Sequence, residues 1–530
     1  MFDYLIRNAM LVDGTGAPAE RGDLAIQGGK IAAVGCLPHA SAAQVLDARG
    51  MYLTPGFLDI HRHADDALFR PGFGRAELAQ GLTTIVNGNC GLSLAPVPAA
   101  RRPEIYGYLT PVTGLPAEEL PTQTMQAYLD AVGAAVLPLN VGMLVGGGTV
   151  RAAAAGFSPE PLDSGALRAV HRLIEQSLSG GALGVSLGLG YAPEIFYTTQ
   201  QLIDALAPLR ESGVPVTVHM RQEGAGVVEA LEEMMTAARA LRTPVHISHL
   251  KSIGKAYWGR YMPRMLEILT RTREEGLDVS CDLYPYTAGS TQLIHVLPPE
   301  SQDGGLAALT EKLREPAFRA RMRERMLTGT DFENLSLLVG WENIDVSTVA
   351  NEENRRFVGR SIAECAEEAH ADPFDFTFDL LASEHCTVTM IDRITSDADI
   401  CAALRAPFSS VISDATYPAS GLLHPRVYGT CTHLIEQYVC KRHVLTLEEA
   451  VKKLTSLPAE VLGLRGKGRL AAGMDADLCL FDAQALHETA TWQAPAQLSE
   501  GMRWVFVGGV PAIREGAFTS AANGRVLRRA

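Results

Sequence analysis

The stretch Tyr52–Asp66 (YLTPGFLDIHRHADD) decides how the rest of the chain is interpreted, because its short apolar run Gly56–His61 leads directly into a second histidine. Successive side chains of a β-strand point to opposite faces, so His61 and His63 share one face and can reach the same cation. A lone histidine at a strand end is more often a hydrogen-bonded packing residue than a ligand. The ends of other strands must therefore supply further ligands if a metal binds here.

Seven more apolar runs follow this one and alternate with amphipathic, helix-like segments such as Leu162–Ser179 and Gly226–Leu241. The seven runs are Thr83–Asn87, Val141–Val145, Ala182–Leu187, Pro215–His219, Pro244–His249, Asp278–Tyr284 and Ser409–Ser413. Short strands that alternate with longer helices predict βα units and a parallel sheet, and eight units predict a TIM-type (β/α)8 barrel. Two further segments, Cys386–Asp392 and Leu335–Val339, also have strand-like composition.

The two ends of the chain differ from this middle part. Both contain short β-prone runs separated by turn signals, such as Gly28-Gly29 near the start and Gly508-Gly509 near the end. The simplest interpretation is one small β-sandwich domain formed by both termini, residues 1–56 and 468–530, attached to a barrel of residues 57–467.

A helical, highly charged segment of about residues 293–345 interrupts the barrel after its seventh predicted strand. Long segments outside a core are often functional, so we interpret this one as an inserted, lid-like segment. An ordinary solvated helical decoration is an equally good interpretation.

Composition limits the class of protein. The chain has 530 residues, 47% of them hydrophobic and 20% charged, which excludes a chain that is disordered throughout. Its net charge of −14 argues against a general nucleic-acid binder. Nine scattered cysteines without a CxxC pair favour a reduced, cytoplasmic protein. The opening Met1–Asn8 has no signal-peptide pattern, and no apolar stretch is long enough to predict a membrane partner. The oligomeric state stays open.

Several predicted strands end in residues that commonly bind metals. The second strand leads into Cys90, the fifth ends at His219, the sixth ends at His249, and the eighth is followed by Asp414. Active sites of TIM-type barrels lie at the carboxyl ends of the strands, so these side chains converge on one rim. Zinc accepts thiolate, imidazole and carboxylate ligands together, which makes it the natural occupant.

The sequence that carries these residues resembles the amidohydrolase superfamily. Within it, the sequence resembles the D-aminoacylases, which are N-acyl-D-amino-acid deacylases. The resemblance covers nearly the whole chain, and the cysteine of the NCG motif at Cys90 is its most specific feature. The matching stretches are Tyr52–Asp66, Gly81–Gly91 (GLTTIVNGNCG), His219–Glu223 (HMRQE), Ile247–Lys251 (ISHLK), Tyr284–Thr291 (YPYTAGST), Ser413-Asp414, His424–Thr430 (HPRVYGT) and Leu454–Asp482.

The resemblance implies a role for each proposed ligand. Cys90, His219 and His249 would hold one tightly bound zinc ion. Asp414 would be the general acid/base and, with the two histidines of the first strand, His61 and His63, would form a second, weaker metal position.

The resemblance also implies a set of substrate contacts. Lys251 would reach the substrate carboxylate, and Tyr284 and Ser290 would contact the same group. Arg426 would be a further clamp for that anion, and Tyr191 would hydrogen-bond the scissile carbonyl. The implied substrate is a small N-acylated amino acid.

We therefore expect zinc-dependent hydrolysis of the amide bond of an N-acyl-D-amino acid, which releases a carboxylate and a D-amino acid. The alternative within enzymes is a cyclic-amide hydrolase of the hydantoinase or dihydroorotase type. That alternative requires a carboxylated lysine at a strand end, and the one candidate, Lys251, follows a histidine by two residues. The alternative outside enzymes is a catalytically silent barrel that serves as an assembly subunit, and such proteins typically lose their metal ligands.

Overall fold

The computed structural model describes residues 1–418 and 420–529, and its centre is a ring of parallel strands. Each of the eight predicted apolar runs overlaps a strand of this ring, so the predicted strand count is confirmed. The strands are β6 (Phe57–Asp59), β8 (Leu82–Asn87), β9 (Asn140–Met143) with its continuation β10 (Val145–Gly146), β11 (Val185–Gly188), β12 (Val216–His219), β13 (Val245–Ile247), β14 (Val279–Leu283) and β18 (Ser409–Val411).

The ring is assembled from two parallel sheets, in the orders β6-β8-β9 and β10-β11-β12-β13-β14-β18. Leu144 continues the ladder between them, because its N–H donates to the Asn87 carbonyl over 2.9 Å. On the other side the Asp414 N–H donates to the His61 carbonyl over 3.0 Å, and β19 (Ala415–Thr416) pairs with β7 (Arg62–His63). These contacts join the eighth strand to the first, as a TIM-type barrel requires.

Helices between the strands cover the outside of the ring. The two amphipathic segments expected from the sequence form α5 (Ser164–Ser179) and α7 (Val227–Leu241). Asp163 caps α5 by accepting a hydrogen bond from the Ala166 N–H over 2.7 Å. The other barrel helices include α1 (Arg75–Ala79), α3 (Met125–Ala134), α4 (Gly147–Ala155), α6 (Thr199–Ala205), α8 (Tyr261–Glu274), α14 (Asp397–Arg405), α15 (Arg426–His433), α16 (Leu447–Leu454) and α17 (Ser456–Val461).

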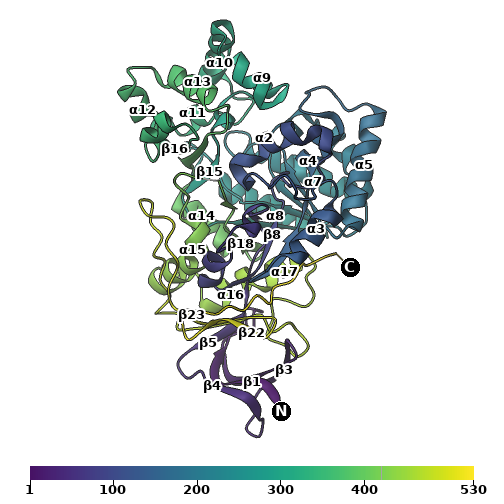
Figure 1. The fold of residues 1–530 in the computed structure, drawn as a ribbon, viewed down its shortest axis with the longest axis vertical. Helices are drawn as coiled ribbons and strands as arrows, with labels where there is room; N and C mark the ends of the chain where they lie inside the picture. The colour runs from purple at the N-terminus through teal and green to yellow at the C-terminus, as the bar shows by residue number, and fades with distance from the viewer. Residues whose placement is uncertain (419, 530) are drawn as a thin grey trace.

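Both termini contribute to one nine-stranded sheet that lies at the end of the molecule opposite helices α9–α13 (Figure 1). Its strands are β1 (Phe2–Leu11), β2 (Glu20–Gln27), β3 (Lys30–Gly35), β4 (Ala42–Asp47), β5 (Tyr52–Pro55), β20 (Leu478–Phe481), β21 (Met502–Val507), β22 (Val510–Arg514) and β23 (Ala517–Phe518). Leu24 of β2 and Phe506 of β21 share one apolar core although four ladders separate their strands, so the sheet folds over on itself. We propose that residues 1–56 and 468–530 form a separate domain around this core.

Ion pairs around one buried carboxylate link the two halves of this sheet. Asp475 is 7% exposed and pairs with Lys30 over 2.7 Å, with Lys467 over 3.1 Å and with Arg525. Burial raises the pKa of this carboxyl, but the positive charges, Lys467 first, outweigh that effect and lower it to about 2. The N-terminal hairpin is therefore tied electrostatically to the C-terminal segment.

The chain between β14 and β18 leaves the barrel and forms a separate small layer of helices and strands (Figure 1). Its strands β15 (Ala288–Gln292), β16 (Ile344–Thr348) and β17 (Thr389–Arg393) form an antiparallel sheet in the order β15-β17-β16. Its helices are α9 (Gly305–Lys312), α10 (Pro316–Thr328), α11 (Leu335–Leu338), α12 (Ile362–Glu368) and α13 (Pro373–Ser383). We call this part, residues 288–393, the insertion; it continues well past residue 345.

One of the two extra strand-like segments is a strand and the other is not. Cys386–Asp392 contains most of β17, which belongs to the insertion rather than to the barrel. Leu335–Val339 was predicted as strand-like and forms helix α11 instead. A short apolar run can form either a buried strand or a turn of helix, so apolar composition alone could not separate the two. Among the described residues, no helix is both long enough and apolar enough to cross a membrane.

Candidate metal centre and active site

Two groups of metal-type ligands meet at the carboxyl ends of the barrel strands and share one cysteine. The first group is Cys90, His219 and His249, and the second is His61, His63, Cys90 and Asp414; within each group the candidate ligand atoms all lie within 4.8 Å of one another. All six predicted ligands therefore come together, in the two sets that the resemblance implied.

The cysteine joins the groups through short contacts. Its Sγ lies 3.2 Å from His61 Nε2 and 3.5 Å from His249 Nε2. In the second group, Asp414 Oδ1 lies 3.3 Å from both His61 Nε2 and His63 Nε2. The ring nitrogens Nδ1 of His61 and His63 are buried and, within the described part of the chain, have no hydrogen-bond partner. This unsatisfied, closely spaced set of thiolate, imidazole and carboxylate groups has the chemistry of a zinc site.

The backbone is unusual at three of the ligands. Cys90, His249 and Asp414 have φ angles of 53°, 37° and 51°, in the left-handed region that residues with a Cβ rarely adopt. Each of them lies one to three residues beyond a barrel strand, where the chain turns away from the ring. Such conformations cost about 1–3 kcal/mol each and are concentrated at functional sites.

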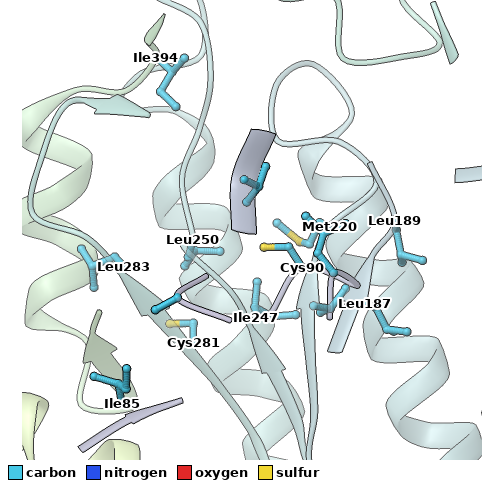
Figure 2. Packing of buried hydrophobic residues seen from close by; sticks show 14 of the residues in the cluster. Ile85, Cys90, Leu187, Leu189, Met220, Ile247, Leu250, Cys281, Leu283 and Ile394 are labelled. Carbon is cyan, nitrogen blue, oxygen red and sulfur yellow. The ribbon is translucent and has the colours of Figure 1, made fainter. Parts of the chain in front are cut away.

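The surroundings of Cys90 favour its thiolate form. Its side chain lies among apolar side chains such as Met220, Leu187 and Ile247, with strands of the barrel below it (Figure 2). Burial raises the pKa of the thiol, but His61 and the other histidines around the sulfur outweigh this and hold the pKa well below its ordinary value. A thiolate is the form that binds a metal.

Glu223 orients one proposed ligand and neutralises a cation. Its Oε1 lies 3.0 Å from His249 Nδ1 and its Oε2 lies 2.7 Å from Lys251 Nζ. Burial raises the pKa of this carboxyl, but Lys251 and two histidines outweigh it and lower the pKa to about 2. A hydrogen bond at Nδ1 leaves Nε2 of His249 free to face Cys90, as metal-binding histidines usually require.

Sequence reasoning did not identify Asp282 of β14 as part of the site. This buried carboxylate lies 3.7 Å from His61 Nδ1 and 2.9 Å from His246 Nε2, and it accepts a hydrogen bond from the His249 N–H. His246 itself lies outside both ligand groups. The sequence held one signal for Asp282, which is an aspartate inside the strand-like run DVSCDLY. An aspartate buried in a strand needs a partner for its charge.

A cavity extends from the ligand groups toward the insertion. Most of the predicted substrate contacts line it, namely Lys251, Tyr191, Tyr284 and Ser290. The Tyr191 ring stacks on the His219 ring with centroids 4.2 Å apart, and its hydroxyl lies 3.3 Å from Thr291 Oγ1. Side chains of the insertion complete the lining, among them His295, Phe332, Glu333 and Asp392.

Arg426 occupies a different position from the other predicted substrate contacts. It is fully buried and does not line the cavity, and its Nη1 lies 3.0 Å from Asp414 Oδ2. Its guanidinium also lies 4.6 Å from the centre of the Tyr284 ring, within range of a cation–π contact. Burial raises the pKa of Asp414, but Arg426 and the histidines outweigh this and lower the pKa well below its ordinary range.

The comparisons with known proteins agree with this geometry. The sequence pattern of the Amidohydrolase family matches residues 44–513. D-aminoacylase of Alcaligenes xylosoxydans xylosoxydans is 33% identical over 528 residues, covering 100% of this chain and 98% of that protein. N-acyl-D-glutamate deacylase of the same organism is 32% identical and covers 99% of this chain and 96% of its own length.

Solved structures of D-aminoacylases and a related deacylase superpose on this structure along its whole length. A crystal structure of D-aminoacylase superposes with a TM-score of 0.83 at 30% identity and covers 100% of both chains. N-acyl-D-glutamate deacylase of Bordetella bronchiseptica, complexed with zinc and a phosphonate inhibitor that mimics the tetrahedral intermediate, superposes with a TM-score of 0.84 at 28% identity, again over 100% of both chains. A D-hydantoinase reaches a TM-score of 0.55 at 16% identity, which shows a shared fold alone. This chain belongs to the amidohydrolase family, and its full-length relatives there include the D-aminoacylases.

Proposed function

We propose that this protein hydrolyses the amide bond of N-acyl-D-amino acids with the help of zinc and releases a carboxylate and a D-amino acid. The observation that carries the proposal is the pair of ligand groups joined by Cys90 beside a cavity. The full-length relatives of the chain are D-aminoacylase and N-acyl-D-aspartate and N-acyl-D-glutamate deacylases. The D-configuration comes from these relatives.

Cys90, His219 and His249 would hold the tightly bound zinc ion, and His61, His63 and Asp414 would form the weaker position with the same cysteine. When bound, zinc supplies a Lewis acid that polarises a carbonyl and lowers the pKa of water to about 7. The thiolate, imidazole and carboxylate donors of these two groups are ligands that zinc accepts.

Asp414 would move the proton. Because its pKa is held low, its carboxylate is ionised and can accept a proton from the attacking water. The same carboxyl would then return that proton to the leaving amine. The Arg426 guanidinium at 3.0 Å fixes the orientation of this carboxylate, which supports a positioning role for the arginine.

The remaining predicted contacts would bind and orient the substrate. Lys251 would attract the substrate carboxylate, and Tyr284 and Ser290, which line the same cavity, would hydrogen-bond it. Tyr191, held by its stacking on His219, would hydrogen-bond the scissile carbonyl. We also propose that the enzyme works in the cytoplasm, because all nine of its cysteines are free thiols.

The test is hydrolysis of N-acetyl and N-formyl derivatives of D- and L-amino acids by zinc-loaded protein. We expect turnover of D-substrates that a chelator abolishes and added zinc restores. Turnover of L-substrates alone would contradict the stereochemical part of the proposal. Full activity on a D-substrate in protein without zinc would contradict the metal-dependent part.

A further inference from the structure

The wall of the cavity that comes from the insertion holds two carboxylates that the proposed reaction does not use. Asp392 of β17 is 3% exposed, and Glu333 lies just before α11; both line the cavity. In the part of the chain that the structure describes, Asp392 Oδ1 is buried without a hydrogen-bond partner. Glu333 Oε2 accepts a hydrogen bond from the Glu223 N–H over 2.6 Å, which ties the insertion to the barrel beside Lys251.

The Asp392 carboxylate lies beside the proposed substrate contacts, because the residue opposite it in the sheet is a glycine. Gly289 of β15 is the direct cross-strand neighbour of Asp392. A Cβ built on Gly289 would lie 3.1 Å from Asp392 Oδ1 and 3.2 Å from the Tyr284 hydroxyl. The Asp392 carboxylate oxygen and the Tyr284 hydroxyl therefore border the same small space, which is open because Gly289 has no side chain.

The charges along the cavity do not balance. Among the described lining residues, the Lys251 ammonium is already paired with Glu223 over 2.7 Å, and Arg221 forms two contacts of 2.9 Å with Glu233 outside the cavity. Burial lowers the pKa of His295 to about 3, so this histidine is neutral. Because Lys251 would bind the substrate carboxylate, an acidic substrate side chain would find no further unpaired cation among the described lining residues outside the two ligand groups.

Both carboxyl groups have raised pKa values in this cavity. Burial raises the pKa of Asp392 to about 6, and burial together with the nearby Glu223 charge raises that of Glu333 to about 8. A cation placed beside these groups would favour their ionised forms, and Glu333, which keeps its proton near pH 7, would release it. A guanidinium or ammonium group on a flexible stem supplies such a cation and several hydrogen-bond donors.

We propose that this wall, through Glu333 and the unpartnered oxygen of Asp392, binds a positively charged group, so that the preferred substrates are N-acyl-D-amino acids with a guanidinium or ammonium side chain. This inference rests on the proposed function. It names a substrate class different from the acidic ones in the names of two relatives.

The first experiment compares kcat/KM of the zinc-loaded enzyme for N-acetyl-D-arginine, N-acetyl-D-lysine, N-acetyl-D-norleucine and N-acetyl-D-glutamate. Charge-assisted hydrogen bonds contribute about 1.5–3 kcal/mol, so we expect a preference for arginine over norleucine of about 10- to 100-fold. A preference for norleucine or glutamate would overturn the inference and leave the proposed function intact. Hydrolysis of none of the four would refute both.

Variants test whether Glu333 and Asp392 cause this substrate preference. We expect Glu333→Gln and Asp392→Asn each to reduce the ratio of kcat/KM for arginine over norleucine by about tenfold, which is about 1.4 kcal/mol. The matched control is Glu353→Gln, because Glu353 is an exposed glutamate of the same insertion. Zinc content and melting temperature identify any variant that fails to fold. An unchanged ratio in the folded variants would overturn the inference, and Glu333→Gln decides alone if Asp392→Asn does not fold.

Discussion

Removal of the Glu223 carboxylate should weaken zinc binding, although Glu223 is not itself a proposed ligand. Its oxygens lie 3.0 Å from His249 Nδ1 and 2.7 Å from Lys251 Nζ. The lowering of its pKa from 4.5 to about 2 corresponds to about 3 kcal/mol of interaction between the carboxylate and its positively charged neighbours. Loss of a partner that orients a metal-binding histidine typically reduces metal affinity 10- to 100-fold.

Two substitutions separate the hydrogen bond from the charge. Glu223→Gln keeps an oxygen that can accept from His249 Nδ1 but removes the charge that faces Lys251, so we expect a zinc Kd about 10-fold higher. Glu223→Ala removes both interactions, and we expect a Kd about 100-fold higher. In both variants Lys251, which is 7% exposed, is left as a buried ammonium without its partner.

The assay is titration of metal-free protein with zinc in competition with a chromophoric chelator. The matched control is Glu229→Gln, because Glu229 is an exposed glutamate of α7 six residues further along the chain. We expect the control to bind zinc like the unmodified protein. Wild-type zinc affinity in the alanine variant would refute the claim that Glu223 orients His249.

Three further changes test other parts of the structure. Cys90→Ala should abolish tight zinc binding, and unchanged metal content in the purified variant would contradict the ligand assignment. Gly190→Ala should lower zinc affinity, because the added Cβ would lie 2.8 Å from His219 Nε2, whereas Gly107→Ala meets nothing within 4 Å and should leave affinity unchanged. Asp475→Asn should destabilise the terminal sheet by about 2 kcal/mol at pH 7, since the folded pKa is about 2 against 3.8 normally. The stabilisation from the lowered pKa is complete above the ordinary value of 3.8 and is lost as the pH falls through 2. Urea unfolding should therefore show no difference between the two proteins well below pH 2.

The sequence alone predicted the barrel and its ligands for a physical reason. Parallel strands of a barrel are buried on both faces and appear as short apolar runs, and their carboxyl ends meet at one rim. The ligands His61, His219, His249 and Asp414 could therefore be assigned to one site from their positions at or just after such runs. The resemblance to the D-aminoacylases then separated them into two metal positions.

The tertiary structure decided what depends on contacts between distant segments. The pairing of Glu223 with Lys251, of Arg426 with Asp414 and of Asp282 with three histidines joins residues whose partners cannot be read from spacing. The same holds for the insertion. Part of it was visible as a charged, helical stretch of about residues 293–345, but its end near residue 393 was not. Only the folded chain brings Glu333 and Asp392 to the cavity, because no pattern in the sequence fixes where these side chains point. The sequence by itself thus determined the class of chemistry, and the packing of the insertion against the barrel determined the charge that the substrate meets.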